Sequence, residues 1–217
     1  MSDIANIRDK VDHEVFDYQV LLDVLSAYRK PRDRIARLVA AGEIVRVKKG
    51  LYVFAAPFRR HPIAREQLAN LIYGPSYVSL DTALTFHGLI PERVEAVTSV
   101  TTGRAHKFDT PFGAFTYRTL SPDRYTVGML LDTSGKAPFL VASPEKALAD
   151  KVWCDKRLIN TRAVDFGAYL LDDLRMDAAR LRDLDAPRLA AINHAYASPK
   201  ITNLLCFLKQ LGTASHA

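Results

Sequence analysis

Residues 30–54 read KPRDRIARLVAAGEIVRVKKGLYVF, and this stretch decides how the N-terminal part of the chain folds. Pro31 suits the first position of a helix, because that position has no amide hydrogen bond to lose. Ile35 and Leu38, followed by one more apolar residue, recur at helical spacing and form a single apolar stripe. Gly42 can end the helix in the left-handed conformation. The pattern therefore predicts a helix between Pro31 and Gly42, with its arginines pointing mainly outward.

The residues after this helix predict a β-hairpin. Residues 43–47 are rich in β-branched side chains and residues 51–54 are aromatic or apolar, so both segments are typical of strands. Gly50 allows the positive φ that a tight chain reversal needs. We therefore expect a hairpin with Lys48 and Lys49 at its tip.

Upstream, residues 17–25 (DYQVLLDVL) place apolar side chains on one helical face, and a short break separates them from Pro31. Helix, turn, basic helix and basic-tipped hairpin follow one another in the order of a winged helix-turn-helix. In that fold the second helix lies in the major groove of DNA, where an arginine fork matches guanine O6 and N7. The hairpin would reach phosphates or the neighbouring minor groove.

The charge distribution points to the same segment. The formal charge is −4 for residues 1–28, +8 for residues 29–60 and +2 for residues 61–217, which gives the +6 of the whole chain. A local excess of this kind favours an anionic partner over a general solubility device. A solvated basic face is the plainer interpretation, but the helix–turn–helix–hairpin order argues against it, and a wing-like domain that contacts protein stays open as the alternative. The residues expected to contact DNA are Lys30, Arg32, Arg34, Arg37, Arg46, Lys48 and Lys49.

Composition limits the other classes of function. The 217 residues are 48% hydrophobic and 25% charged, which is usual for a globular protein and excludes intrinsic disorder. No apolar stretch is long enough to cross a bilayer, and the acidic N-terminus does not resemble a signal peptide, so we expect a cytoplasmic protein. Cys154 and Cys206 are then expected to stay reduced. Because the six histidines are scattered, we expect no metal and no cofactor.

Two domains are expected in an α+β protein. Residues 1–58 form the winged helix-turn-helix, the proline-containing stretch Pro57–Pro62 forms the boundary, and residues 63–217 form a second domain. In the second domain, period-two patterns predict a small antiparallel sheet, and helices beginning at Ser143-Pro144 and Ser198-Pro199 predict a C-terminal helical bundle. The expected strands are Val94–Thr101, Ala114–Leu120, Tyr125–Leu131 and Pro138–Val141.

Catalytic interpretations are weaker, and we expect no enzyme. Ser79, Asp81 and His87 are the residue types of a hydrolase triad, but on one short helix they cannot converge, so Ser79 is expected to cap that helix. Asp183-Leu184-Asp185 lacks the Gly-Ser turn that would hold a triphosphate, and we interpret it as a helix-capping pair. Glu145-Lys146 lacks the spacing that would place both groups on one face of a strand.

The chain resembles the AbiEi antitoxins of AbiE-type (type IV) toxin–antitoxin systems, over roughly residues 15–155. The resemblance lies in the basic helix that runs into Gly42, in Gly50-Leu51-Tyr52, in Tyr77-Val78-Ser79-Leu80 before a helix ending at Gly88-Leu89, in Thr110-Pro111-Phe112-Gly113, and in Ala142-Ser143-Pro144-Glu145-Lys146-Ala147-Leu148. It implies a winged helix that binds inverted repeats of double-stranded DNA in its own promoter. It also implies a C-terminal domain that counteracts a co-encoded nucleotidyltransferase-like toxin, by direct or indirect contact.

We therefore expect a DNA-binding antitoxin that represses its own operon. The alternative is a stand-alone winged-helix repressor whose C-terminal domain senses a ligand or oligomerises. The chain has no coiled-coil heptad, so we expect a monomer in solution, with two copies binding side by side on inverted half-sites.

Overall fold

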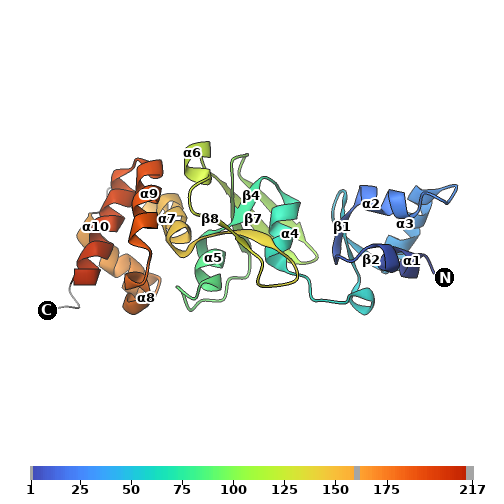
Figure 1. Cartoon of the computed structure of the whole chain (residues 1–217), viewed down its shortest axis with the longest axis horizontal. Helices are drawn as coiled ribbons and strands as arrows, with labels where there is room; N and C mark the ends of the chain where they lie inside the picture. Colours follow the sequence, from blue (N-terminus) through green and yellow to red (C-terminus); the bar gives the residue numbers. More distant parts are fainter. Residues whose placement is uncertain (1, 159–161, 214–217) are drawn as a thin grey trace.

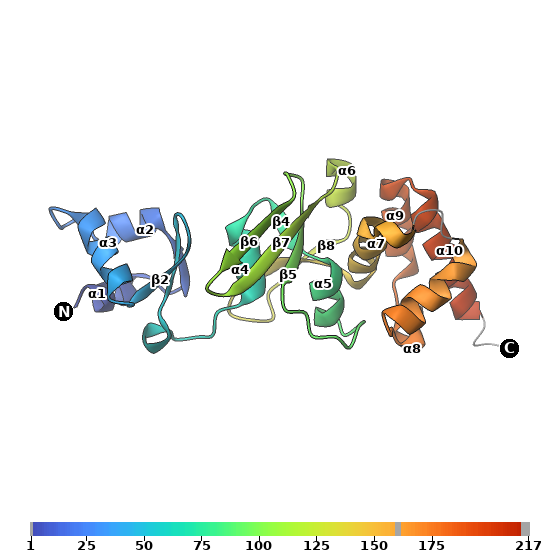
Figure 2. The same cartoon turned by 180° about the vertical axis from the view of Figure 1, so that it is seen from behind.

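The computed structural model describes residues 2–158 and 162–213. Three parts follow one another along the longest axis: an N-terminal unit of helices with a small sheet, a larger central sheet, and a group of C-terminal helices (Figure 1). The first and last described residues lie at opposite ends, as the view from behind also shows (Figure 2). The α+β class expected from the sequence is confirmed.

The N-terminal unit contains four helical segments and a three-stranded antiparallel sheet with the strand order β1-β3-β2. Helix α3 begins at Pro31, and Gly42 and Gly50 have φ values of 67° and 86°, which confirms the predicted helix end and hairpin turn. The first helix and first strand were not expected from the sequence. The elements are α1 (Asp3–Lys10), β1 (Val15–Asp17), α2 (Tyr18–Val24), α3 (Pro31–Ala40), β2 (Ile44–Lys48), β3 (Leu51–Phe54) and the short 3₁₀ turn η1 (Ala56–Phe58).

Strand β3 is buried on both faces, which explains why its four residues are all apolar or aromatic. Tyr52 and Phe54 belong to the core of the N-terminal unit, where the Phe54 ring lies 4.6 Å from that of Phe16. Leu51 and Val53 point the other way and belong to the core of the rest of the chain. The small sheet is therefore a layer shared by two hydrophobic cores.

The central sheet has six strands in the order β6-β7-β5-β4-β9-β8. Helix α4 packs against its middle strands on one face, and α5 lies on the other face against β5 and α7. The elements are α4 (Arg65–Ile72), β4 (Ser76–Val78), α5 (Leu80–Phe86), β5 (Val97–Thr101), β6 (His106–Thr110), β7 (Gly113–Thr119), α6 (Pro122–Tyr125), β8 (Met129–Asp132) and β9 (Phe139–Ala142).

The prediction of a small, purely antiparallel sheet was wrong. β4 pairs with β9 and β5 pairs with β7 in parallel, while the other three pairs are antiparallel. The short central strand β4 and the polar edge strand β6 were missed, because three residues give no periodicity and HKFDT is mostly exposed. The strand expected from Tyr125 begins only at Met129, since the Ser121-Pro122 start makes residues 122–125 helical.

The C-terminal helices confirm the expected helical part. Ser143 caps α7, and its side chain accepts a hydrogen bond from the Lys146 amide. The last helix begins at Pro199 as predicted, and it buries Ile201 and three leucines of its apolar stripe. The elements are α7 (Pro144–Cys154), η2 (Lys156–Leu158), η3 (Ala163–Asp165), the π-helical η4 (Ala168–Asp173), α8 (Ala178–Arg182), α9 (Ala186–Tyr196) and α10 (Pro199–Thr213).

A buried polar cluster joins the central sheet to these helices. Lys146 and Asp150, one turn apart on α7, are fully buried, and their Nζ and carboxylate oxygen lie 2.9 Å apart. The Asp150 carboxylate also accepts hydrogen bonds from Tyr77 (3.0 Å), Ser79 (2.6 Å) and Tyr196. Lys146 donates further to the Tyr196 hydroxyl at 2.7 Å. Burial lowers the pKa of Lys146, against the opposing effect of Asp150.

This cluster corrects one sequence interpretation, and neighbouring contacts settle two others. Ser79 precedes α5 but its side chain makes no capping hydrogen bond, because its hydroxyl donates to Asp150 instead. Asp185 does cap α9, as expected, by accepting from the Arg188 amide. Glu145 accepts from the Asp185 amide and pairs with Arg188 at 3.1 Å, so Glu145 and Lys146 point to different partners.

We predict that Asp150→Asn lowers the free energy of unfolding by about 3–5 kcal/mol, because it leaves the buried Lys146 charge unpaired. The control is Asp109→Asn, which removes the exposed pair with Lys107 and should cost about 1 kcal/mol or less. Urea denaturation of both variants measures the difference. Equal losses of stability would contradict the role given to the buried pair.

Candidate nucleic-acid interface

The outer surface of α3 carries free cations. Arg32 and Arg37 are exposed, and no hydrogen bond or ion pair joins either of them to another residue of the described ranges 2–158 and 162–213. Lys30 lies 3.9 Å from Asp33, and both side chains are mostly exposed. Because Ile35 and Leu38 are buried on the opposite side, the helix is fixed with these cations toward solvent.

Arg34 differs from its neighbours because it already has partners. Its guanidinium lies 2.5 Å from the Asp3 carboxylate of α1 and 3.8 Å from the centre of the Tyr28 ring. Burial alone would raise the pKa of Asp3, but hydrogen bonds from Arg34 and Tyr28 outweigh it and hold that pKa below its usual value. The sequence placed Arg34 mainly outward, whereas its side chain is 37% exposed.

The hairpin cations divide into two kinds. Lys49 and Arg46 are exposed, and the Arg46 side chain donates to the Lys48 carbonyl at 3.4 Å. Lys48 is half-buried, and its Nζ donates to the carbonyl of Ile72 at the end of α4. Burial lowers the pKa of Lys48. Lys48 therefore joins the hairpin to the second part of the chain.

The structure brings together only part of the predicted set. α3 lies on the side of the N-terminal unit that faces away from the central sheet, whereas the hairpin lies on the side toward it (Figures 1 and 2). Lys30, Arg34 and Arg37 line one recess of about 240 Å³ beside α3. Arg46, Lys48 and Lys49 belong to a separate surface on the hairpin.

Two further residues of the recess were missed from the sequence. Tyr28 and Arg29, in the turn before α3, line it together with the α3 cations. Arg29 is exposed, and its position directly before Lys30 continues the basic run, which was the signal available for it. Tyr28 gives no such signal, because its role depends on the position of the Arg34 guanidinium.

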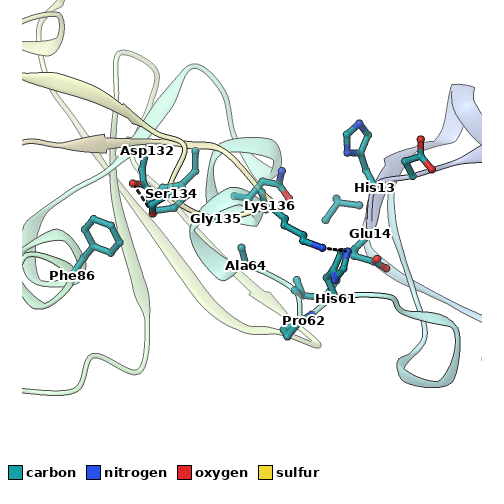
Figure 3. A pocket seen from close by; sticks show the side chains of 16 residues that line it. His13, Glu14, His61, Pro62, Ala64, Phe86, Asp132, Ser134, Gly135 and Lys136 are labelled. Atoms are coloured by element: carbon teal, nitrogen blue, oxygen red, sulfur yellow. Dashed lines mark hydrogen bonds between the residues drawn. The ribbon is translucent and has the colours of Figure 1, made fainter.

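A second recess lies where the N-terminal unit meets the central sheet, with a volume of about 400 Å³. His61 and Lys136 point toward one another across it, and the Lys136 Nζ lies 3.2 Å from Nε2 of His61 (Figure 3). Asp132 accepts from Ser134 at 3.0 Å on the side of the central sheet. Its walls carry both signs of charge, and no group of three metal-ligating side chains occurs among the described residues.

Comparisons with known proteins give no family for this chain. No protein-family model matches the chain, and no curated protein sequence matches it. Within the part of the chain that the structure describes, no helix combines the length and the apolar character that a membrane crossing requires.

We predict that the Asp3 carboxyl group titrates below its ordinary pKa of 3.8 in the folded protein, and that Arg34→Gln moves the midpoint upward. Because this pKa is lowered on folding, the interaction stabilises the protein above pH 3.8 and is lost as the pH falls through the lowered value. Carboxyl-carbon NMR during an acid titration measures the midpoint. Arg32→Gln is the control, and a midpoint that Arg34→Gln leaves in place would contradict the pairing.

Proposed function

We propose that this protein is a DNA-binding antitoxin and autorepressor of the AbiEi type. One observation carries the DNA-binding part: Arg32 and Arg37 of α3 are exposed and have no hydrogen bond or ion pair within the described residues, on a helix that a hydrophobic core holds in place. Free guanidinium groups on a fixed helix can form bidentate hydrogen bonds to guanine without first breaking an internal ion pair.

We propose that the N-terminal unit is a winged helix-turn-helix with α3 as its recognition helix. The order of α2, α3 and the β2–β3 hairpin, closed by β1 into a three-stranded sheet, supports this assignment. Arg46 and Lys49, on the separate surface of the hairpin, would contact phosphates at a distance from the groove that α3 enters. Asp3 would position Arg34 at the edge of that groove, because it holds the guanidinium beside Tyr28.

The antitoxin part of the proposal depends on the resemblance of residues 15–155 to AbiEi proteins. The neighbouring gene is then expected to encode a nucleotidyltransferase-like toxin. Co-expression of the full chain with that neighbouring open reading frame, scored by growth, tests this part directly. A neighbouring product that is harmless alone, or whose toxicity this protein fails to relieve, would contradict it.

Autorepression needs two copies, because one recognition helix reads only a few base pairs. We propose that monomers bind inverted half-sites side by side in the promoter of the operon. Light scattering on the free protein, combined with binding to duplexes of one and two half-sites, tests this. A stable dimer in solution would contradict the monomer, and equal affinity for both duplexes would contradict cooperative binding.

A stand-alone repressor with a ligand-sensing second unit is the alternative. The recess at the junction of the two units favours it, because a ligand held between Glu14 and Lys136 would contact both units at once (Figure 3). One experiment distinguishes the antitoxin from the stand-alone repressor. A stand-alone repressor would bind its promoter but would not protect cells from any neighbouring gene product.

We predict that Arg37→Ala weakens binding to the operator by about 1–3 kcal/mol and relaxes sequence preference, because a base-reading fork is lost. Mobility-shift titrations with operator and unrelated duplexes measure both effects. The matched control is Arg93→Ala, which removes an exposed arginine of the loop before β5. Unchanged operator affinity of Arg37→Ala together with Arg32→Ala would contradict α3 as the reading helix.

The two tip lysines should behave differently. We predict that Lys49→Ala weakens binding to all duplexes alike. The slope of log affinity against log salt concentration should become shallower by about one, which corresponds to one lost phosphate contact. Lys48→Ala should change DNA affinity less, because its Nζ is already bonded to the Ile72 carbonyl. Titrations at two salt concentrations measure the difference. A larger effect of Lys48→Ala would show that this lysine leaves α4 to contact DNA.

A further inference from the structure

A polar pocket of about 260 Å³ lies on the central sheet, on the face opposite α4. It opens between strands β5 and β7 on one side and the ends of α5 and α7 on the other. None of the DNA-contacting side chains proposed above belongs to it. Its lining residues are Leu80, Asp81, Thr98, Thr116, Arg118, Lys151, Cys154, Asp155 and Lys156.

The floor of the pocket follows from the parallel pairing of β5 and β7. Thr98 and Thr116 are direct partners in that pair. The next residue, Tyr117, points to the opposite face, where its hydroxyl donates to the Ala69 carbonyl of α4 at 2.7 Å. Since side chains alternate along a strand, Thr116 and Arg118 share the face that carries the pocket.

The two carboxylates of the pocket already have cationic partners. Asp81 lies 2.6 Å from Lys151, and both side chains are mostly buried. Asp155 pairs with Arg157 at 2.8 Å and accepts from the Tyr169 hydroxyl at 3.0 Å. Hydrogen bonds from Arg157 hold the pKa of Asp155 well below its usual range. Each carboxylate is therefore paired with a cation of its own, so the two do not prevent an anion from entering.

Arg118 and Lys156 supply the unbalanced charge of the pocket. Both are exposed, and neither has a hydrogen bond or an ion pair with any residue in the described part of the chain. Lys200, which does not line the pocket, donates to the Asp155 carbonyl at 2.6 Å. With Asp81 and Asp155 neutralised by their own partners, the pocket carries a net positive charge from these free cations.

We propose that this pocket binds the phosphate group of a phosphate monoester such as a nucleoside monophosphate. The Arg118 fork fits two oxygens of a tetrahedral dianion, Lys156 adds a point charge, and the Thr116 hydroxyl is available as a third donor. A volume of about 260 Å³ is below the roughly 300–1,000 Å³ of pockets that enclose drug-sized ligands, so the phosphate enters and the rest of the molecule lies outside.

Binding at this pocket involves no covalent step at Cys154. Burial raises the pKa of the Cys154 thiol to about 11, so this side chain is not a nucleophile at neutral pH. The proposal is independent of DNA binding by α3, since the two surfaces share no residue. The same phosphate chemistry occurs in the backbone of nucleic acids, where each group is a singly charged diester, and the experiment separates the two sources.

Calorimetric titration of the full chain with inorganic phosphate, adenosine 5′-monophosphate and adenosine tests the proposal. We expect both phosphates to bind and adenosine not to bind. If neither inorganic phosphate nor the nucleotide binds at ~10 mM, well above a weak dissociation constant of about 1 mM, the proposal is overturned. Equal binding of adenosine would overturn it as well, because the phosphate would then contribute nothing.

Single variants locate the site. We expect Arg118→Gln and Lys156→Gln each to weaken nucleotide binding by about tenfold, because each removes one charged hydrogen-bond donor. The matched control Lys209→Gln changes an exposed lysine of α10 and should leave binding unchanged. Circular dichroism verifies that the variants fold. If Arg118→Gln weakens binding of a DNA duplex but not of the nucleotide, Arg118 contacts the phosphate backbone of DNA. The proposed nucleotide site is then wrong.

Discussion

The ion pair between Lys146 and Asp150 is the interaction on which the larger part of the molecule depends. It is fully buried, so each charge costs several kcal/mol unless its partners are in place. Those partners are Tyr77 of β4, Ser79 just before α5, Tyr196 of α9, and the Arg124 carbonyl of α6, at 2.5 Å from Lys146. If the central sheet shifted against the C-terminal helices, Lys146 or Asp150 would lose its partners. A buried charge would then face an apolar core without compensation.

The parts of the fold that could be predicted are those set by local patterns. The α3 helix and the hairpin follow from Pro31, Gly42, Gly50 and the apolar spacing between them, and all were found where expected. The parallel pairs of the central sheet could not be predicted, because they depend on β4, a strand of three residues. Nothing in three residues distinguishes a central strand from a turn before the next helix.

In the candidate site, too, the sequence predicts some features and only the tertiary structure shows the others. The sequence locates the cations, since Arg32, Arg37 and Lys49 lie on exposed surfaces as their pattern indicates. It does not show which cations already have partners. Arg34 pairs with a residue 31 positions away and Lys48 with a carbonyl 24 positions away, and neither contact leaves a local signal. Distinguishing a free cation from an occupied one required the tertiary structure.

If the N-terminal unit binds operators as we propose, the burial of β3 on both faces has a consequence for operator spacing. A reading head on a flexible tether could serve half-sites at almost any separation, because the tether would absorb the difference. Here Leu51 and Val53 join the N-terminal unit to the hydrophobic core of the rest of the chain, and a flexible tether alone does not connect them. Two copies on inverted half-sites would then clash or lose contact with each other whenever the spacing between the half-sites changed by a fraction of the helical repeat of about 10 base pairs. Spacing, and not only base sequence, would become part of what the protein recognises.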